Sequence, residues 1–406
     1  MDSKPHPAAL DTSHRGSALE VLGAFLKLGL TSFGGPVAHL GYFRTEFVEQ
    51  RRWLDDRSYS DLVALCQFLP GPASSQVGMA LGLGRAGWLG ALAAWIGFTM
   101  PSAIALILFA FGIAEWAGLA SSSVVHGLKV VAVAVVAQAV MGMAKSLCPD
   151  RLRAGLAVVA ALAVLAVPSA LGQVAVIALG GLVGRFAVRV EQLQPAMHRD
   201  YGISKRIGAT LLILFGLLLI GLPALAAGTG STVASAVAVF YKAGALVFGG
   251  GHVVLPLIQS GVVPPGWVSN DTFLAGYGAA QAVPGPLFTI AAYLGAAMPA
   301  PLGGWVGGMT LLLAMFLPAF LLVAGALPFW ETLRQRGSVQ QAMAGVNAAV
   351  VGVLVAALYD PVWTSSIHNK EDFGLALAAF GLLIFGRVSP VLVVAGSAVV
   401  AGGLRL

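Results

Sequence analysis

FLKLGLTSFGG at residues 25–35 and FYKAGALVFGG at residues 240–250 are two versions of one motif, identical at six of eleven positions. A second motif repeats in the same order, as QFLPGP from Gln67 and QAVPGP from Gln281, at an offset of 214. The first motif repeats at an offset of 215, so both belong to one internal duplication. Each motif places helix-breaking Gly or Pro beside isolated polar residues in an apolar run, which marks these breaks as candidate functional positions.

Composition places the chain in a membrane. Apolar residues make up 58% of it and charged residues only 10%, whereas soluble domains carry about 25% charged residues. The net charge of +6 comes from basic residues scattered between apolar segments, which does not indicate a nucleic-acid partner. Cys66 and Cys148 lack the spacing of a metal site, and no cofactor is indicated. We interpret residues 1–17 as a retained cytoplasmic polar tail, because they contain no signal-peptide pattern.

Apolar segments recur along the rest of the chain in the order six, one and six. Because an even-numbered unit would keep its orientation when repeated directly, the single central segment at 208–228 inverts the second copy. We therefore predict an all-α integral membrane protein with two inverted-topology repeats at 18–190 and 231–406, joined by a cytoplasmic linker and inverting helix at 191–230. The thirteen predicted segments are 18–34, 59–83, 86–116, 122–147, 152–167, 169–190, 208–228, 232–250, 271–298, 302–330, 339–359, 372–386 and 388–404.

The distribution of basic residues tests this orientation. If the N-terminus is inside and every segment crosses, 14 of the 23 Lys and Arg residues lie inside and six outside. Arg44, Arg51, Arg52 and Arg57 are then on the wrong side. They move inside, and the count becomes 18 against two, if the first elements of each copy are re-entrant and turn at the Gly and Pro breaks. We favour broken or re-entrant helices, and both versions keep the inverted halves.

The breaks have the chemistry of an anion site. Pro36 and Pro72 each follow a glycine and can start a new helix, whose free N–H groups and positive dipole end attract anions. Ser74, Ser75 and Gln76 can add donors after Pro72. The second copy is less polar, because Phe288, Thr289 and Ile290 follow Pro286 and Gly251 replaces Pro36. We therefore predict that the first copy holds most of the anion.

Lysines occupy matched positions in the two copies. A lysine inside a membrane segment costs about 2.5–3.5 kcal/mol, so Lys27 and Lys242 are candidates to present two positive charges to one dianion. The alternative is that their side chains extend to the membrane surface. Lys129 aligns with Asn347 and is equally suited to helix packing or to ligand contact.

Other polar residues near the breaks have two interpretations each. Gln67 and Gln281 can cap the freed backbone groups or bind the ligand. His39 and His252 do not align, and proton coupling through them is the less favoured interpretation. The balanced charges at 46–57 are interpreted as a solvated amphipathic surface stretch, where Arg44 can attract an anion to an entrance.

FGGP at 33–36 and PGP at 70–72, with their echoes FGGG at 248–251 and PGP at 284–286, resemble the motifs of the chromate ion transporter (CHR) family. Gly-Trp pairs at 87–88 and 304–305 add to the resemblance, which covers nearly the whole chain in the long two-domain form. It implies export of chromate across the bacterial inner membrane, chromate resistance and sulfate as a structural mimic. The distribution of basic residues separately predicts a cytoplasmic N-terminus and a periplasmic C-terminus. The family motifs map onto Gly34, Gly35, Pro36, Pro70, Gly71 and Pro72.

A dianion leaving a cell that is negative inside gains about 2.3 kcal/mol per charge per 100 mV, so membrane potential or a proton gradient can drive export. The runner-up function is transport of sulfate or another tetrahedral oxyanion. A membrane enzyme acting on a lipid phosphate is a remote alternative, because no nucleophile and base pair lies beside the PGP motifs. The sequence leaves homo-oligomerisation open. The candidate anion-binding residues are Lys27, Gly34, Gly35, Pro36, Gln67, Pro70, Gly71, Pro72, Ser74, Ser75, Gln76, Lys242, Gly249, Gly250, Gln281, Pro284, Gly285 and Pro286, with Arg44, His39, His252 and Lys129 as candidate entrance or coupling residues.

Overall fold

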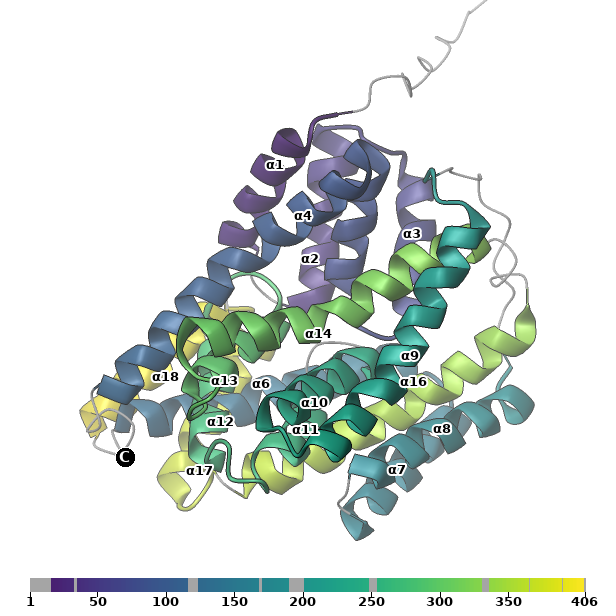
Figure 1. Ribbon diagram of the computed structural model, residues 1–406. Helices are drawn as coiled ribbons and strands as arrows, with labels where there is room; N and C mark the ends of the chain where they lie inside the picture. The colour runs from purple at the N-terminus through teal and green to yellow at the C-terminus, as the bar shows by residue number, and fades with distance from the viewer. Residues whose placement is uncertain are drawn as a thin grey trace, which may run out of the picture.

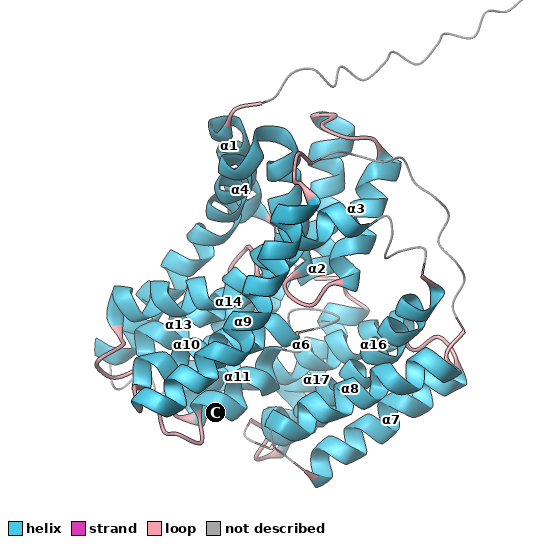
Figure 2. Ribbon diagram, turned by 45° about the vertical axis from the view of Figure 1, so that its right-hand side comes forward, coloured by secondary structure: helices cyan, strands magenta, loops and turns pink. Residues whose placement is uncertain are grey.

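The computed structural model consists of helices and connecting loops, with no β-strand in the residues that it describes (Figures 1 and 2). The prediction of an all-α protein is therefore confirmed for this part of the chain. The described residues are 16–32, 35–115, 123–167, 170–189, 201–247, 254–330, 336–364, 366–388 and 390–404.

Helices of the first copy begin and end at the predicted breaks. The α1 helix stops before the FGG sequence, and the PGP sequence separates α3 from α4. Gly71 within PGP has a φ of 120°, which only glycine adopts without strain, and proline has no N–H for a helical hydrogen bond. The elements are α1 (Ala18–Thr31), α2 (Gly35–Arg44), the π-helical η1 (Thr45–Gln50), α3 (Asp56–Phe68), α4 (Ala73–Glu115), α6 (Ser123–Leu147), α7 (Arg151–Ala166) and α8 (Ala170–Ala187).

The α4 helix is folded back on itself. Ala86 and Gly87 leave the helical conformation, with φ values of −139° and 65°. A Cβ placed on Gly90 would lie 2.2 Å from the carbonyl oxygen of Gly82, although residues eight apart in a continuous helix are separated by about 12 Å. The chain therefore forms two arms, 73–85 and 88–115, that pack closely where glycine removes the side chains.

The second copy repeats this plan. A Cβ on Gly295 would lie 2.3 Å from the carbonyl oxygen of Gly307, so the helices before and after the Gly-Trp pair again pack through glycines. The long α9 (Lys205–Thr229) connects the copies. The second-copy elements are α10 (Thr232–Leu246), α11 (Val254–Val262), α12 (Asn270–Ala282), η3 (Leu287–Thr289), α13 (Ile290–Ala297), α14 (Gly304–Ala326), η4 (Leu327–Phe329), α16 (Gly337–Ala357), η5 (Leu358–Trp363), α17 (Lys370–Ile384) and α18 (Pro390–Leu404).

The copies exchange helices. The α6 helix of the first copy packs against α17 and α18 of the second, whereas α16 packs against α7 and α8 of the first (Figure 1). Glycines bring these helices together: a Cβ on Gly345 would lie 2.1 Å from the carbonyl oxygen of Gly180. Small residues at helix contacts let backbones approach, as is common in membrane proteins. Neither copy therefore has a core of its own.

Several helices are suited to a lipid environment. Among the described residues, four helices are long and apolar enough to cross a membrane by length and composition, namely Ala73–Gly112, Lys205–Thr229, Gly304–Phe329 and Gly337–Asp360. Only 6% of the most apolar window of Lys205–Thr229 is buried inside the protein. Such a surface is unfavourable in water and favourable against lipid, so the chain is an integral membrane protein.

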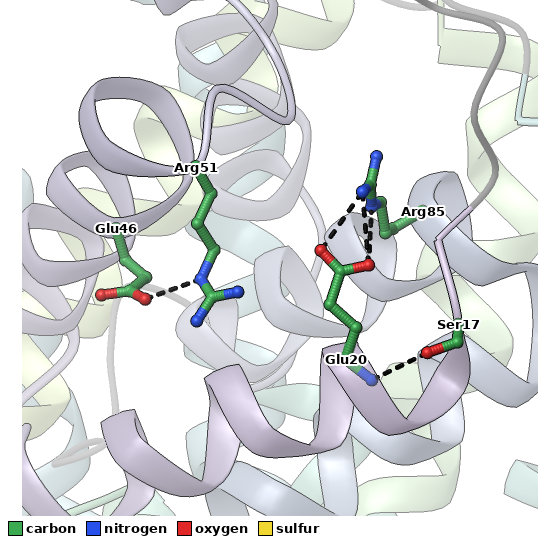
Figure 3. Close-up of polar contacts among 5 residues, drawn as sticks. All are labelled: Ser17, Glu20, Glu46, Arg51 and Arg85. Carbon is green, nitrogen blue, oxygen red and sulfur yellow. Dashed lines mark hydrogen bonds and ion pairs between the residues drawn. The ribbon is translucent and has the colours of Figure 1, made fainter.

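The start of α1 and the segment that follows η1 lie at the same end of the molecule. The Gly16 N–H donates to the Arg85 carbonyl at 3.0 Å, and Arg85 pairs with Glu20 at 3.2 Å (Figure 3). The Arg85 and Arg51 guanidinium groups both lie over the Trp53 ring, at 5.4 and 5.8 Å. We call Glu20, Glu46, Arg51, Trp53 and Arg85 the charged end.

Candidate functional site

The breaks of the two copies meet and exchange hydrogen bonds. The Gly71 N–H donates to the Val247 carbonyl at 2.6 Å, so the first PGP break contacts the end of α10. The Gly285 N–H donates to the Ser32 carbonyl at 2.9 Å, so the second PGP break contacts the end of α1. These reciprocal bonds relate matched positions, since Gly285 repeats Gly71 at the same offset that relates the two PGP motifs. The breaks of the two copies therefore contact each other through these two bonds, and we call this contact the central crossing.

Buried polar residues gather beside this crossing on the first copy. Each is at most 3% exposed, although most of the surrounding chain is apolar. We call this set the polar cluster, and its members are Ser32, His39, Ser74, Ser75, Gln76, Thr99 and Ser102.

The polar cluster combines residues from the end of α1, from α2 and from α4. The Nδ1 atom of His39 in α2 lies 3.4 Å from the Ser74 hydroxyl in α4, and the edge of its ring meets Phe98 at 5.2 Å. A Cβ on Gly285 would lie 3.0 Å from the Ser102 hydroxyl. Because Gly285 also donates to Ser32, the second-copy PGP break closes the cluster from the other side.

Five polar atoms of the cluster have no hydrogen-bond partner among the described residues. Buried polar groups are nearly always paired with protein, water or a ligand. The hydroxyl groups can donate to an oxyanion, whereas an amide oxygen can only accept. The unpaired atoms are Ser32 Oγ, His39 Nε2, Ser75 Oγ, Gln76 Oε1 and Thr99 Oγ1.

The first turn of α4 faces the same region. The helix starts at Ala73, directly after PGP, and the Gln76 N–H already donates to the Pro72 carbonyl at 2.9 Å. The preceding amides at 73–75 belong to the first turn, which leaves its N–H groups free for side chains, water or an anion. The Gln76 Nε2 donates to the Pro70 carbonyl at 2.8 Å and holds the PGP turn. The structure thus combines a helix start with unpaired hydroxyl groups.

The matching positions of the second copy are largely apolar. Phe288 and Ile290 repeat Ser74 and Gln76 when the two PGP motifs are aligned. Thr289 repeats Ser75, and its hydroxyl donates to the Pro286 carbonyl at 2.8 Å, so it is already paired. The Gly87-Trp88 and Gly304-Trp305 pairs give a local offset of 217, which places Phe316 at Thr99 and Ala319 at Ser102. Among the described residues, the unpaired buried hydroxyl groups beside the crossing therefore belong to the first copy.

The two repeated lysines have different surroundings. Lys27 Nζ lies 2.6 Å from the Glu46 Oε2, and the Lys27 side chain is 56% exposed. Glu46 is only 5% exposed, so the interpretation of residues 46–57 as a solvated stretch is wrong at this position. Lys242 is half-buried.

The glutamines, Arg44 and Lys129 lie in different environments. Gln67 is exposed, whereas the Gln281 Nε2 is buried. Arg44 pairs with Glu49 and, at 2.6 Å, with Asp56 on the surface. Lys129 pairs across the copies with Asp271 at 2.8 Å, an arrangement that fits the helix-packing interpretation. Arg44 and Lys129 are therefore each already paired with a carboxylate.

Several predicted residues add no side-chain donor to the cluster. Gly35 and Pro36 are half-buried at the start of α2, and Pro284 is half-buried before Gly285. Gly34, Gly249, Gly250 and His252 lie outside the described residues. In the part of the chain that is described, no group of three His, Cys, Asp or Glu side chains could hold a metal ion.

Sequence reasoning missed four residues. Ser32, Thr99 and Ser102 belong to the polar cluster, and Glu46 is the buried partner of Lys27. Thr99 and Ser102 flank Pro101 inside an apolar run, a signal similar to the one that identified Ser74 and Ser75. Nothing in the sequence distinguishes Glu46 from the exposed Glu49 three residues later.

The apolar helices and the paired helix breaks define an integral membrane protein of duplicated architecture. Its sequence matches the chromate transporter family over residues 19–185 and 234–402, and the chain belongs to that family. It is 31% identical to the chromate transport protein of Pseudomonas aeruginosa over 386 residues, which cover 89% of this chain and 86% of that one. It is 27% identical to the chromate transport protein of Cupriavidus metallidurans over 385 residues, covering 93% and 90%. No solved structure matches the chain.

Proposed function

We propose that this protein exports chromate from the bacterial cytoplasm, with the polar cluster as the main anion site. The observation that carries the proposal is the placement of unpaired buried hydroxyl groups beside the first turn of α4, where the breaks of both copies cross. Hydroxyl groups and helix N–H groups are suitable donors for a tetrahedral oxyanion. Names of the relatives support chromate as the transported ion.

Charge and burial support a mechanism in which the site opens to one side at a time. The polar cluster is almost closed to solvent, so the helices must part before an anion can reach it. Movement of a dianion out of a negative interior releases about 4.6 kcal/mol at 100 mV, which sustains a gradient of about three decades. We propose that membrane potential supplies this energy, with proton antiport as the alternative, and that export confers chromate resistance.

Everted membrane vesicles test the direction and the driving force. An imposed interior-positive potential, which matches the polarity of the cell, is expected to drive uptake of radiolabelled chromate, and sulfate is expected to compete. The physical reason is the double charge of the anion. Vesicles without the protein provide the control. If uptake depends on a proton gradient and not on membrane potential, proton antiport is favoured. If no uptake occurs with either gradient, chromate export is contradicted.

We propose that the protein lies in the bacterial inner membrane as two inverted repeats, 18–190 and 231–406, with thirteen segments in a 6+1+6 order. The α9 helix is the inverting segment, the N-terminus is cytoplasmic and the C-terminus is periplasmic. The α1 helix has only 14 residues, or about 21 Å, against a hydrocarbon core of about 30 Å. Since Arg51 and Arg85 share the Trp53 ring near the start of α1, the first elements fit a re-entrant arrangement.

Cysteine labelling tests this arrangement. A cysteine at the exposed Gln50 is expected to react with a membrane-impermeant maleimide from the same side as a cysteine at the exposed Ser17. The reason is that η1 and the start of α1 lie at one end of the molecule. The variants are made in a Cys148→Ser background, which leaves only the buried Cys66. Labelling of the two positions from opposite sides would instead support full crossing by every segment.

A further inference from the structure

A buried carboxylate at the charged end is held by two cations. Glu46 is 5% exposed, and its two oxygens are used separately. The Lys27 Nζ lies 2.6 Å from Oε2 and the Arg51 Nε lies 2.7 Å from Oε1 (Figure 3 shows the second contact). Lys27 and Arg51 are themselves 56% and 34% exposed. One negative charge therefore lies beneath two positive charges that reach the surface.

Glu46 stays ionised in this arrangement. Burial alone would raise its pKa, but hydrogen bonds and charges from Lys27 and Arg51 outweigh burial and hold the pKa below the usual value. The carboxylate is thus ionised near neutral pH and acts as the counter-ion of Lys27 and Arg51. It competes with any external anion for the same two cations.

An aromatic column begins beside Glu46. The next residue, Phe47, stacks on Trp53 at 4.5 Å and on Phe25 at 4.8 Å between ring centres. Both phenylalanines are fully buried. The column therefore extends inward from the charged end.

The column reaches the polar cluster. Phe43 meets Phe47 at 5.9 Å and Phe98 at 5.0 Å, and Phe98 in turn contacts the His39 ring at 5.2 Å. Lys27 precedes Ser32 of the cluster by five residues along the chain. The buried aromatic column therefore connects the charged end, where the two cations lie, with the candidate anion site.

The sequence of the second copy does not repeat the carboxylate or the arginine that pairs with it. Lys242 repeats Lys27, but Ser260 and Pro265 stand at the positions of Glu46 and Arg51 when PGP and Trp267 set the offset of 214. The carboxylate is therefore a specialisation of the copy that carries the polar cluster, and the duplication does not require it.

We propose that Glu46 determines anion selectivity by charge, because a substrate dianion displaces it from Lys27 and Arg51 whereas a monovalent anion does not. This inference rests on the proposed transport function. An anion tethered within the same chain acts at an effective concentration of about millimolar or higher. A monovalent ion offers no more charge than the carboxylate that it must replace, while a dianion offers twice the Coulomb attraction. Chloride and nitrate are thereby excluded although they are small and mobile.

Competition measurements on the full chain in proteoliposomes test this role. With wild-type protein, nitrate is expected to have little effect on uptake of radiolabelled chromate. With Glu46→Gln, which keeps the shape but removes the charge, the inhibition constant of nitrate should fall by about tenfold or more. Sulfate should compete with chromate in both proteins. Glu49→Gln is the matched control, because Glu49 is on the same element but is 50% exposed and pairs with Arg44.

Each outcome has a separate meaning. Unchanged nitrate exclusion by Glu46→Gln, beside normal wild-type uptake of chromate, would overturn the role of Glu46. Absence of chromate uptake by the wild type would instead overturn the proposed function. If Glu46→Gln does not fold, Lys27→Met provides the second test, since its side chain is 56% exposed. Its chromate KM should rise about tenfold, and a wild-type KM would also overturn the inference.

Discussion

Chromate transport is expected to fall by about 100-fold or more when Ser75→Ala and Thr99→Val are combined, with no loss of stability. The Ser75 and Thr99 hydroxyl groups are buried and have no described hydrogen-bond partner, so removing them breaks no bond within the described part of the protein. A hydrogen bond to a charged ligand contributes about 1.5–3 kcal/mol, and two of them correspond to at least about 100-fold. Removal of an unpaired buried hydroxyl does not destabilise the fold.

Two measurements separate this prediction from a structural effect. Vesicle uptake gives transport, and thermal unfolding in detergent gives stability. The matched control is Thr289→Val, at the position that repeats Ser75, because its hydroxyl is already paired with Pro286. It is expected to lower stability by about 1 kcal/mol and to leave most transport intact. If the double variant transports chromate as well as the wild type does, the polar cluster is not the anion site.

Gly71→Ala is expected to disrupt the central crossing and to abolish most transport. Gly71 has a φ of 120°, and a Cβ there would lie 2.9 Å from the Gln76 Nε2. Displacement of the Gln76 side chain would break its bond to Pro70 and weaken the Gly71 contact with Val247. Strained backbone of this kind costs about 1–3 kcal/mol and a lost hydrogen bond adds to that cost, so we expect the unfolding free energy to fall by about 2 kcal/mol or more.

Thermal unfolding and vesicle uptake of the same variants check this result. Gly23→Ala is the matched control, because Gly23 is an exposed helical residue with nothing within 4 Å of a Cβ. Alanine there favours the helix by up to about 1 kcal/mol, so stability should be unchanged or higher. Wild-type stability and transport in Gly71→Ala would mean that the crossing does not depend on the PGP geometry.

The sequence predicted the helix breaks of the first copy well. Proline lacks an N–H and glycine tolerates positive φ, so the helix ends at PGP and FGG follow from residue chemistry. Ser74, Ser75 and Gln76 were also identified correctly as polar residues at a helix start. Their ligand role is still a prediction. Duplication of the motifs indicated that both breaks matter, but not which atoms of one copy contact the other.

Residues distant in sequence account for what could not be predicted. Thr99 comes from the second arm of α4, after the reversal at Gly87, whereas Ser74 and Ser75 belong to the first arm. Glu46 is buried, and its partner Lys27 comes from α1, 19 residues earlier in the sequence. The pattern of charges along residues 46–57 does not reveal which of them is buried. It therefore suggested that the whole stretch is a solvated surface.

The amino-acid sequence by itself determined that this is a duplicated helical membrane protein whose helices break at FGG and PGP, because composition, repeat spacing and the chemistry of Gly and Pro act locally. Only the tertiary structure decided that the two sets of breaks cross through the Gly71–Val247 and Gly285–Ser32 bonds. It also decided that Lys27 is neutralised by Glu46 and that Ser32, Thr99 and Ser102 are buried polar residues of the same copy as Ser74 and Ser75. These outcomes depend on contacts between distant segments, which form only when the exchanged helices pack together.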